Sequence, residues 1–377
     1  MKKALIIANL GGFVEFLFDD IKILRSMGYE VEYAANDKIS NWDVYKNKLI
    51  DMNVPIHNVD FASKNPLSKD NLLAYKQIKK ILKEGNYDLI HCHTPITGLL
   101  TKLAARKYRK SGTKVIYTTH GFTFNKNASK KSWLIFYTIE KFSSKMCDAI
   151  ITINNEDYEE AKKMWCKQVY YIHGMGVDIA KYADVNINKN EYKEKNGIPT
   201  DKIMILSVGE LSDRKNHKII IDAISKLENK NDYVFVICGK GINGGTETYL
   251  KERAKELNVN LILMGFRTDI PEIIHCSDIG ALPSIREGLG LAGIQSLSAG
   301  VPIIATDVQG IKDYIIDGQT GFLCKYNDSE AFAKAIKKLS DENTRKSMKE
   351  NCKEMAKKFS MEISSKERKE IYNKILK

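Results

Sequence analysis

The chain alternates short, continuous runs of apolar, mostly β-branched residues with longer stretches in which apolar residues recur at helical spacing. Runs that are apolar throughout fit parallel strands covered by helices on both faces, because such strands expose no face to water. The expected strands are residues 4–8, 31–35, 89–92, 115–119, 149–153, 169–173, 203–208, 233–238, 261–264, 279–282 and 302–305. The expected helices include residues 72–83, 131–144, 217–227, 246–257 and 329–339. This order predicts an α/β protein with two Rossmann-like, doubly wound sheets.

The length of 377 residues suits two such domains, at roughly 150 residues per domain. A polar segment, residues 184–199, follows the last expected strand of the first half, and residues 341–377 predict two or three charged helices. We expect one domain at residues 1–175, a second at 176–358, and a terminal helix at 359–377. Because open α/β sheets bind ligands at the carboxyl ends of their strands, functional residues are expected in the loops after the strands.

The composition and the first residues of the sequence favour a cytoplasmic location for the protein. Seven cysteines without a CxxC pair, several of them inside apolar runs, indicate buried, reduced thiols rather than a disulfide framework or a zinc site. The apolar part of the start MKKALIIANLGGF is too short for a signal peptide. Residues 288–306 carry no charge, but their glycines, proline and polar residues favour a buried helix and strand over a membrane span.

Two strand ends in the first half carry residues suited to a ligand. Gly11 and Gly12 follow the first strand, with a helix expected from about Val14; they form either an ordinary tight turn or a backbone approach to an anion at a helix N-terminus. His91 and His93 lie two residues apart on a strand and share a face, and His120 ends the next strand. No third ligand is near in sequence, so a polar surface for sugar or phosphate oxygens is favoured over a metal site.

Two glycine-containing loops in the second half suit phosphate. Gly209 precedes Arg214 and Lys215, which are expected at a helix start, where the helix dipole favours anions over cations. Two cations in that place indicate either a phosphate between them or a solvated turn. The segment from Gly239 through Gly241 to Gly244 spells GxGxxG after a strand, yet the next strand does not end in the acidic residue that binds ribose in dinucleotide sites. A loop close to phosphate is therefore favoured over an NAD site.

The most informative segment is residues 283–297, PSIREGLGLAGIQSL. A strand ends, an Arg-Glu pair follows, and a glycine-rich turn opens an apolar helix. Glu287 stands just before that helix, where a carboxylate is oriented to accept hydrogen bonds from hydroxyls. Gln295 lies two helical turns further on, and a buried amide there would need partners such as ligand hydroxyls.

Taken in order, these segments resemble the bacterial GT-B glycosyltransferases of the family 4 type, which use nucleotide sugars with retention of anomeric configuration. The resemblance covers nearly the whole chain. It rests on Gly11-Gly12, His120-Gly121, HGMGVD (173–178), VGELSDRKN (208–216), Gly239–Gly241, the block 286–306 and DGQTGFL (317–323). HGMGVD and GELSxRKN look like the branch that builds capsule, exopolysaccharide and other cell-envelope glycans.

The resemblance implies transfer of a hexose from a nucleotide sugar, UDP-hexose or UDP-N-acetylhexosamine, to a growing, lipid-linked cell-envelope glycan. The first domain would face the acceptor, the second would bind the donor, and the terminal helix would pack back on the first. Lys215 and Arg214 would neutralise the departing diphosphate, Glu287 would bind hydroxyls of the donor sugar, and His120 would contact the sugar or the reacting region. Further donor contacts are expected at Gly11, Gly12, Gly209, Gly239, Gly241, Gly288, Leu289, Gly290, Leu291 and Gln295.

The resemblance also implies that no metal and no cofactor are needed. Retention in this family is described as a front-face reaction in which the donor phosphate helps to deprotonate the acceptor, which would explain why no paired carboxylates or dedicated base stand out. Two residues depart from the pattern. Many members have Glu where Gln295 stands, and Arg where Glu210 stands. Gln295 would bind ribose as a neutral group with one acceptor oxygen, and we expect Arg214 to replace the missing positive charge.

The net charge of +12 permits anionic partners. Residues 101–145 contain eleven Lys or Arg and one acid, Glu140. This run is either a solvated helix face or a surface that docks on the anionic inner leaflet of the cell membrane, where each basic residue contributes about 1 kcal/mol. Nucleic acid is not expected as a partner, since no helix-turn-helix, RNA-binding or zinc-finger pattern accompanies the charge.

Two other functions stay open at this point. One is a sugar-nucleotide epimerase or hydrolase on the same fold, which would need acid/base carboxylates in the first domain; only Asp19 and Asp20 stand out there, in an expected helix. The other is a non-catalytic nucleotide-sugar binding protein, which the glutamine at position 295 would allow.

Overall fold

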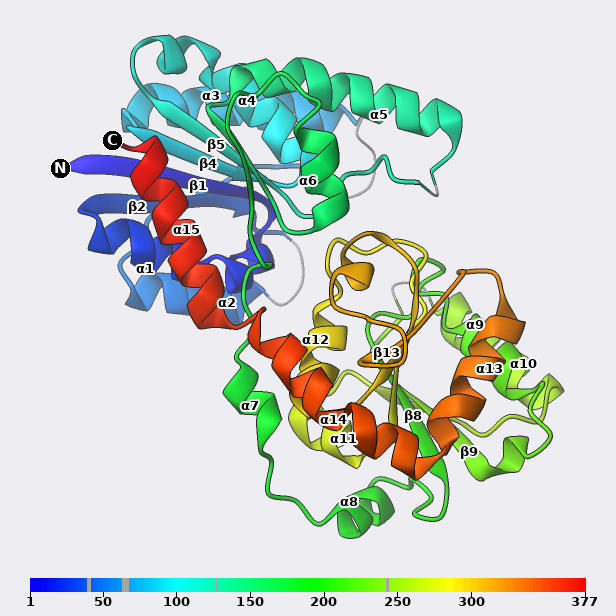
Figure 1. Ribbon diagram of the computed structural model, residues 1–377. Coiled ribbons are helices and arrows are strands. Elements are labelled where there is room, and N and C mark those ends of the chain that lie inside the picture. The colour runs from blue at the N-terminus through cyan, green and yellow to red at the C-terminus, as the bar shows by residue number, and fades with distance from the viewer. Residues whose placement is uncertain (39–41, 63–67, 127, 242–243) are drawn as a thin grey trace. The chain divides into compact units, whose positions relative to one another are not determined.

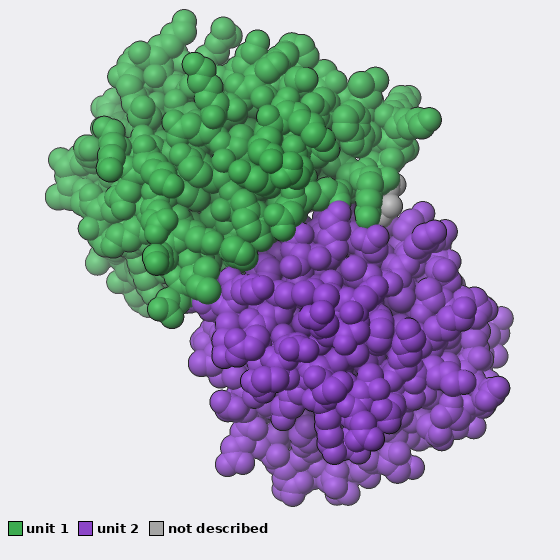
Figure 2. Space-filling view, in the orientation of Figure 1, with its two compact units in different colours: residues 1–176, 362–377 green, residues 177–361 purple. Residues whose placement is uncertain are grey.

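The computed structural model of the chain describes residues 1–38, 42–62, 68–126, 128–241 and 244–377. These residues form two compact units: unit 1 comprises residues 1–176 and 362–377, and unit 2 comprises residues 177–361 (Figures 1 and 2). The chain therefore leaves unit 1 after Gly176 and returns to it at Glu362. The boundaries expected from the sequence lie one and three residues earlier.

Unit 1 is built on a parallel sheet of seven strands in the order β3-β2-β1-β4-β5-β6-β7. Its strands are β1 (Lys2–Leu10), β2 (Tyr29–Asn36), β3 (Ile56–Asn58), β4 (Leu89–His93), β5 (Lys114–Thr119), β6 (Ala149–Thr152) and β7 (Val169–Tyr171). Its helices are η1 (Gly11–Phe16), α1 (Phe18–Ser26), α2 (Trp42–Asp51), α3 (Lys69–Gly85), α4 (Pro95–Lys110), α5 (Lys130–Ser143), η2 (Ser144–Met146), α6 (Asn155–Ala161) and α15 (Met361–Ile375).

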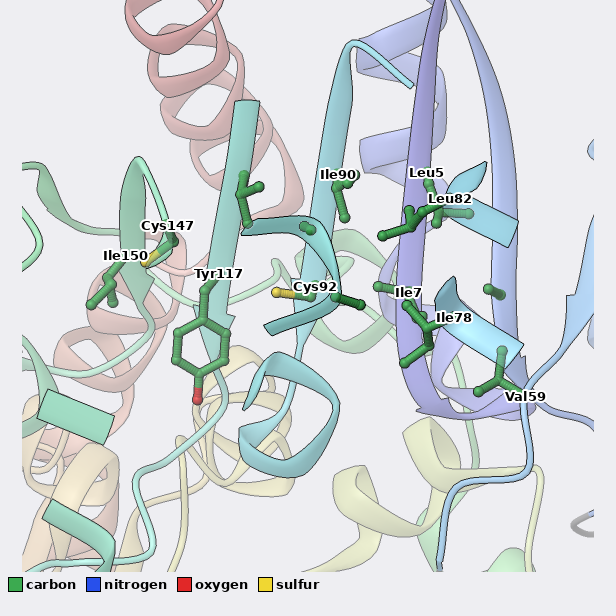
Figure 3. Packing of buried hydrophobic residues seen from close by; sticks show 14 of the residues in the cluster. Leu5, Ile7, Val59, Ile78, Leu82, Ile90, Cys92, Tyr117, Cys147 and Ile150 are labelled. Carbon is green, nitrogen blue, oxygen red and sulfur yellow. The ribbon is translucent and has the colours of Figure 1, made fainter. Parts of the chain in front are cut away.

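The core of unit 1 follows from strands that are apolar on both faces. Leu5, Ile6 and Ile7 of the central strand β1 are all fully buried, as expected where helices cover both sides of a parallel sheet. On one side, Leu5 and Ile7 face Ile78 and Leu82 of α3 (Figure 3).

Unit 2 contains a parallel sheet of six strands in the order β10-β9-β8-β11-β12-β13. Its strands are β8 (Ile203–Val208), β9 (Tyr233–Cys238), β10 (Leu261–Gly265), β11 (Ile279–Leu282), β12 (Ile303–Thr306) and β13 (Gly321–Cys324). Its helices are α7 (Ile179–Ala183), α8 (Lys189–Lys195), α9 (Lys218–Ile224), η3 (Lys230–Asp232), α10 (Gly245–Glu256), α11 (Ile270–Cys276), α12 (Leu291–Ser298), η4 (Gln309–Asp313), α13 (Ser329–Ser340) and α14 (Glu342–Lys357).

The fold class expected from the sequence is confirmed, and each expected strand is present. The edge strands β3 and β13, of three and four residues, were not expected. The helix expected from about Val14 is present in two parts: a 3₁₀-helix at Gly11–Phe16 and helix α1, which begins at Phe18.

The uncharged run at residues 288–306 folds as helix α12 and strand β12, with most of its side chains buried. Among the described helices, none combines the length and apolar character needed to cross a lipid bilayer. All seven cysteines are buried, free thiols, as their positions in apolar runs predict.

Candidate active site

In unit 2, two loops that are distant in sequence meet at the carboxyl ends of neighbouring strands. One follows β8 and the other follows β11, and these strands pair in the centre of the sheet. The loops are joined by backbone, where Ile285 N–H donates to the carbonyl of Arg214 at 2.8 Å. They are also joined by Asn216, whose buried amide donates to the carbonyls of Pro283 and Tyr326 at 3.2 and 2.8 Å. The side chains that the two loops carry are therefore held at one edge of the sheet.

Glu287 is the centre of a charged cluster at this edge. Its Oε1 atom lies 2.5 Å from Nζ of Lys215 and 3.2 Å from a guanidinium nitrogen of Arg214. The hydroxyl of Ser284 donates to the same oxygen at 3.0 Å. Arg214 also pairs with Oε1 of Glu210 at 3.0 Å, four residues earlier in the chain. The structure thus brings together the three charged residues that the sequence singled out.

The charges of this cluster hold each other in their ionised forms. Burial would raise the pKa of Glu287, but Lys215 and Arg214 outweigh it, so its pKa lies below the ordinary glutamate value. Burial would lower the pKa of Arg214, yet Glu287 and Glu210 raise it above the ordinary arginine value. Burial, followed by repulsion from Arg214, lowers the pKa of Arg286. With Arg286 included, three cations face two carboxylates, which leaves the cluster net positive.

Among the described residues, hydrogen bonds to the Glu287 carboxylate reach one of its two oxygens. Within the described part of the chain, Oε2 has no hydrogen-bond partner, whereas Oε1 accepts from three donors. A carboxylate oxygen has two lone-pair sites, so Oε2 can accept from two hydroxyl groups. Close by, α12 begins after Gly290, which offers no side-chain cap to the first amides of the helix. The edge therefore presents one acceptor oxygen and a helix N-terminus, beside an excess of positive charge.

The glycines in this region are explained first by close packing. A Cβ at Gly239 would lie 1.8 Å from the carbonyl oxygen of Gly209, and Gly241 forms a β-bridge with Leu211. Gly290 has φ +77°, and a Cβ there would lie 2.9 Å from Leu282. A larger residue at Gly239 or Gly290 would displace the loops that carry Arg214 and Glu287. Residues 242 and 243 of the GxGxxG segment lie outside the described residues.

Two premises of the sequence reasoning are wrong. Arg214 and Lys215 were expected at a helix start, but α9 begins at Lys218, and their charges are compensated by Glu287 and Glu210. Gln295 was expected to be a buried amide, but it is half-buried on α12, and its side chain makes no hydrogen bond to another described residue. Leu289 is buried, while Gly288 and Leu291 are half-buried beside Glu287 in sequence.

In unit 1, Gly11 lies at the carboxyl end of β1 and is tightly enclosed. A Cβ on Gly11 would meet the ring of Trp42 at 2.6 Å, and the hydroxyl of Tyr33 donates to the Gly11 carbonyl at 3.2 Å. Gly12 is less enclosed, since the nearest atoms to its Cβ position belong to Tyr45 at 3.7 Å. The glycine at position 11 is thus required by the packing of α2 against the loop, whatever the loop binds.

The three histidines expected at neighbouring strand ends do gather in unit 1. His91 and His93 lie on β4 with ring centroids 4.2 Å apart, and Nδ1 of His93 lies 3.1 Å from Nε2 of His120 after β5. Burial lowers the pKa of His91 to about 4 and that of His120 to about 3, so both rings are neutral at neutral pH. His93 is fully buried and His120 is partly exposed, next to the ring of Phe13 at 4.7 Å.

Other residues of these sites carry no signal in the sequence. Ser284 is one of them, and it is fully buried against Glu287. In unit 1, both ring nitrogens of His91 are bonded to protein, to Tyr372 and to Thr118. A search of the described residues for three or more His, Cys, Asp or Glu side chains able to hold a metal ion finds no such group.

Comparison with known sequences covers both units. Residues 10–181 match the family described as Glycosyltransferase Family 4, and residues 188–358 match the family described as Glycosyl transferases group 1. The glycosyltransferase-like EpsD protein of Bacillus subtilis (strain 168) is 38% identical over 333 residues, which are 87% of this chain and 84% of that protein. The Escherichia coli UDP-Gal:alpha-D-GlcNAc-diphosphoundecaprenol alpha-1,3-galactosyltransferase is 33% identical over 72% of this chain and 71% of its own.

Solved structures share the fold at lower identity. HepE of Anabaena, crystallised with UDP and glucose, superposes with a TM-score of 0.81 at 18% identity, covering 99% of this chain and all of that one. WaaG, a glycosyltransferase involved in lipopolysaccharide biosynthesis, gives a TM-score of 0.71 at 16% identity over 98% of this chain and 99% of that one. The two sheets, the matched families and these relatives agree: the chain is a GT-B protein and belongs to the group 1 glycosyl transferases, with a first half of the glycosyltransferase family 4 type.

Proposed function

We propose that this glycosyltransferase moves a hexosyl group from UDP-hexose or UDP-N-acetylhexosamine to a lipid-linked cell-envelope glycan, with retention of configuration. The main support for the proposal is that the two carboxylate oxygens of Glu287 have different surroundings. Its Oε1 holds Lys215 and Arg214, while Oε2 is left to accept hydroxyl groups of the donor sugar. Cations and a sugar-binding carboxylate on one edge suit a sugar attached to a diphosphate.

The relatives support the donor and acceptor classes. The E. coli relative acts, by its name, on UDP-Gal and a GlcNAc-diphosphoundecaprenol acceptor, and HepE binds UDP and glucose. In the proposed reaction, Lys215 and Arg214 stabilise the negative charge of the departing diphosphate. His120 contacts the sugar, Gln295 binds the ribose, and the backbone of Gly11 and Gly12 approaches the phosphates. The donor phosphate takes the proton of the acceptor hydroxyl, and we propose that Lys215 and Arg214 neutralise the diphosphate without a metal or a cofactor.

Turnover assays test this function. UDP-galactose, UDP-glucose and their N-acetyl counterparts are each incubated with a polyprenyl-diphosphate-linked sugar, with and without EDTA. We expect UDP release that depends on the acceptor and is unchanged by EDTA, with an α-linked product from the α-linked donor by NMR. UDP release without acceptor would indicate a hydrolase, and donor binding without any turnover would indicate a non-catalytic binding protein.

The surface formed by the basic run at residues 101–145 carries positive charge without the single acid that the run contains. That acid, Glu140, is buried and pairs with buried Lys102 at 3.2 Å, so neither contributes to the surface. Beside helices α4 and α5 lies a hollow of about 530 Å³, lined by Arg106, Arg109, Lys110, Phe142, Lys145, Met146 and Asp148. Asp148, which lies outside the run, pairs with Arg109 at 3.0 Å.

Large apolar side chains are exposed on the same helices. Phe142 is 60% exposed and packs edge to face on Trp165, and Nζ of Lys145 lies 3.9 Å from the Trp165 ring. The other exposed apolar residues are Leu103 on α4, Leu134, Ile135 and Ile139 on α5, and Trp165 after α6; these residues, Phe142 and the basic lining of the hollow are called the docking face. Apolar side chains beside a cationic hollow match the acyl and phosphate regions of an anionic bilayer. We propose that the protein binds peripherally to the inner face of the cell membrane through this face.

A charge-reversal pair tests the docking face. The Arg106→Glu/Lys110→Glu variant is expected to reduce binding to phosphatidylglycerol-containing vesicles at least about tenfold, because each basic residue at the surface contributes about 1 kcal/mol. Co-sedimentation at low and high salt measures it. Lys334→Glu/Lys337→Glu makes the same charge change at exposed positions of α13 in unit 2 and should bind nearly as well as wild type. Wild-type vesicle binding that does not depend on the anionic lipid content or on the salt concentration would contradict the proposal.

A further inference from the structure

A chain of buried polar side chains connects the terminal helix α15 to the histidines at the sheet edge of unit 1. Arg368 of α15 pairs with Asp20 at 2.6 Å and with Asp19 at 2.7 Å. The hydroxyl of Tyr372, one turn further along α15, donates to the other oxygen of Asp20 at 2.7 Å. Asp20, Arg368 and Tyr372 are almost completely buried. Buried charges are tolerated only where they are paired and hydrogen-bonded, so this network of side chains has one well-defined arrangement.

The arrangement fixes the tautomer of His91. The carboxylate of Asp20 can only accept hydrogen bonds, so the Tyr372 hydroxyl donates its single hydrogen to Asp20. The oxygen of Tyr372 lies 2.7 Å from Nδ1 of His91 and must accept, which places a proton on Nδ1. Nε2 of this neutral ring then accepts from the hydroxyl of Thr118, also at 2.7 Å. His91 is thus held at both nitrogens, in one orientation.

His93 lies between His91 and the partly exposed His120 and contacts both. His93 lies against His91, with 4.2 Å between ring centroids. Nε2 of His93 has no hydrogen-bond partner in the described part of the chain, and its Nδ1 bonds to His120 at 3.1 Å. The His93 ring is therefore oriented only by packing, in which His91 is the nearest aromatic ring, and by its bond to His120.

We infer that Tyr372 is a positioning residue for His120: its hydroxyl fixes His91, His91 packs against His93 and orients its ring, and His93 holds the ring of His120 through their hydrogen bond. The catalytic consequence rests on the proposed contact of His120 with the sugar. The helix that closes the chain then has a role in the chemistry of unit 1 as well as in its stability. Sequence separation hides this role, since Tyr372 is 281 residues from His91.

The test is Tyr372→Phe, which removes the hydroxyl and keeps the ring. The protein has seven histidines, so ¹⁵N-histidine labelling gives a readable NMR spectrum of the ring nitrogens. We expect altered ring-nitrogen shifts for both His91 and His120, and a kcat about tenfold lower with little change in donor KM, as for loss of one hydrogen bond. The matched control is Ser364→Ala on the same helix, which removes a buried hydrogen bond to the Gly174 carbonyl and should leave the histidine spectrum and kcat unchanged.

The outcomes separate this inference from the proposed function. Unchanged His120 signals in Tyr372→Phe would overturn the inference while leaving the proposed function untouched. Altered His120 signals with unchanged kcat would support the positioning and contradict the proposed sugar contact of His120. If Tyr372→Phe does not fold, Thr118→Val breaks the same chain at the other nitrogen of His91 and is expected to alter the His120 signals in the same way.

Discussion

We expect Lys215→Ala to lower turnover about 100- to 1000-fold, the range for loss of a group that stabilises charge developing in a transition state. Nζ of Lys215 is the closest cation to Glu287, at 2.5 Å, and the loop around it is anchored by Asn216. Without Lys215, Arg214 would face the diphosphate alone. Steady-state kinetics with the donor and isothermal titration with UDP measure the effect, and weaker UDP binding should accompany slower turnover.

Lys218→Ala is the matched control for this prediction. Lys218 is exposed and begins α9 only three residues later, so the change removes the same charge from the same stretch of chain. We expect its turnover to stay within about twofold of wild type, as for surface substitutions away from special features. If Lys215→Ala behaved like Lys218→Ala, with UDP affinity intact, the diphosphate role of Lys215 would be wrong.

The architecture was predictable because each central strand is encoded locally. Leu5, Ile6 and Ile7, for example, lie within one continuous apolar run, and burial on both faces of a parallel sheet accounts for it. The strand Ile56–Asn58 escaped prediction because two of its three residues are polar and its pairing with β2 comes from tertiary structure. The 3₁₀ form of the helix that begins at Gly11 was not predicted for a similar reason, since Trp42 packs against that glycine from another helix.

The candidate site was predictable as a set of residues, but its pairings were not. Lys215 and Glu287 were each singled out by their local motifs, yet they are 72 residues apart. Only the pairing of β8 with β11 brings the two loops together. A cation before a helix therefore looked like an unfavourable charge that needed a ligand, whereas the fold supplies Glu287 as its partner. Tyr372 and Arg368 gave no signal, because their partners lie in the first hundred residues of the chain.

The second large effect is expected for Glu287→Gln, which we predict to lower turnover about 100- to 1000-fold. The amide is nearly isosteric but uncharged, and it has one acceptor oxygen in place of two. That oxygen cannot serve Lys215, Arg214 and the sugar hydroxyls together. Glu210→Gln is the control, because it also removes a carboxylate from Arg214 but leaves both oxygens of Glu287 in place. We expect it to lower turnover less than about threefold.

For Glu287→Gln we also expect a pH-dependent change in the free energy of unfolding. Folding lowers the pKa of Glu287 below the ordinary value of 4.5, so its ionised form stabilises the fold above that pH. The contribution is lost as the pH falls through the folded-state pKa. Glu287→Gln should therefore be less stable than wild type by about 1–3 kcal/mol at pH 7, and the difference should shrink as the pH falls below 4.5. Denaturant unfolding at several pH values measures this, and a difference independent of pH would show that Lys215 and Arg214 do not depend on the Glu287 charge.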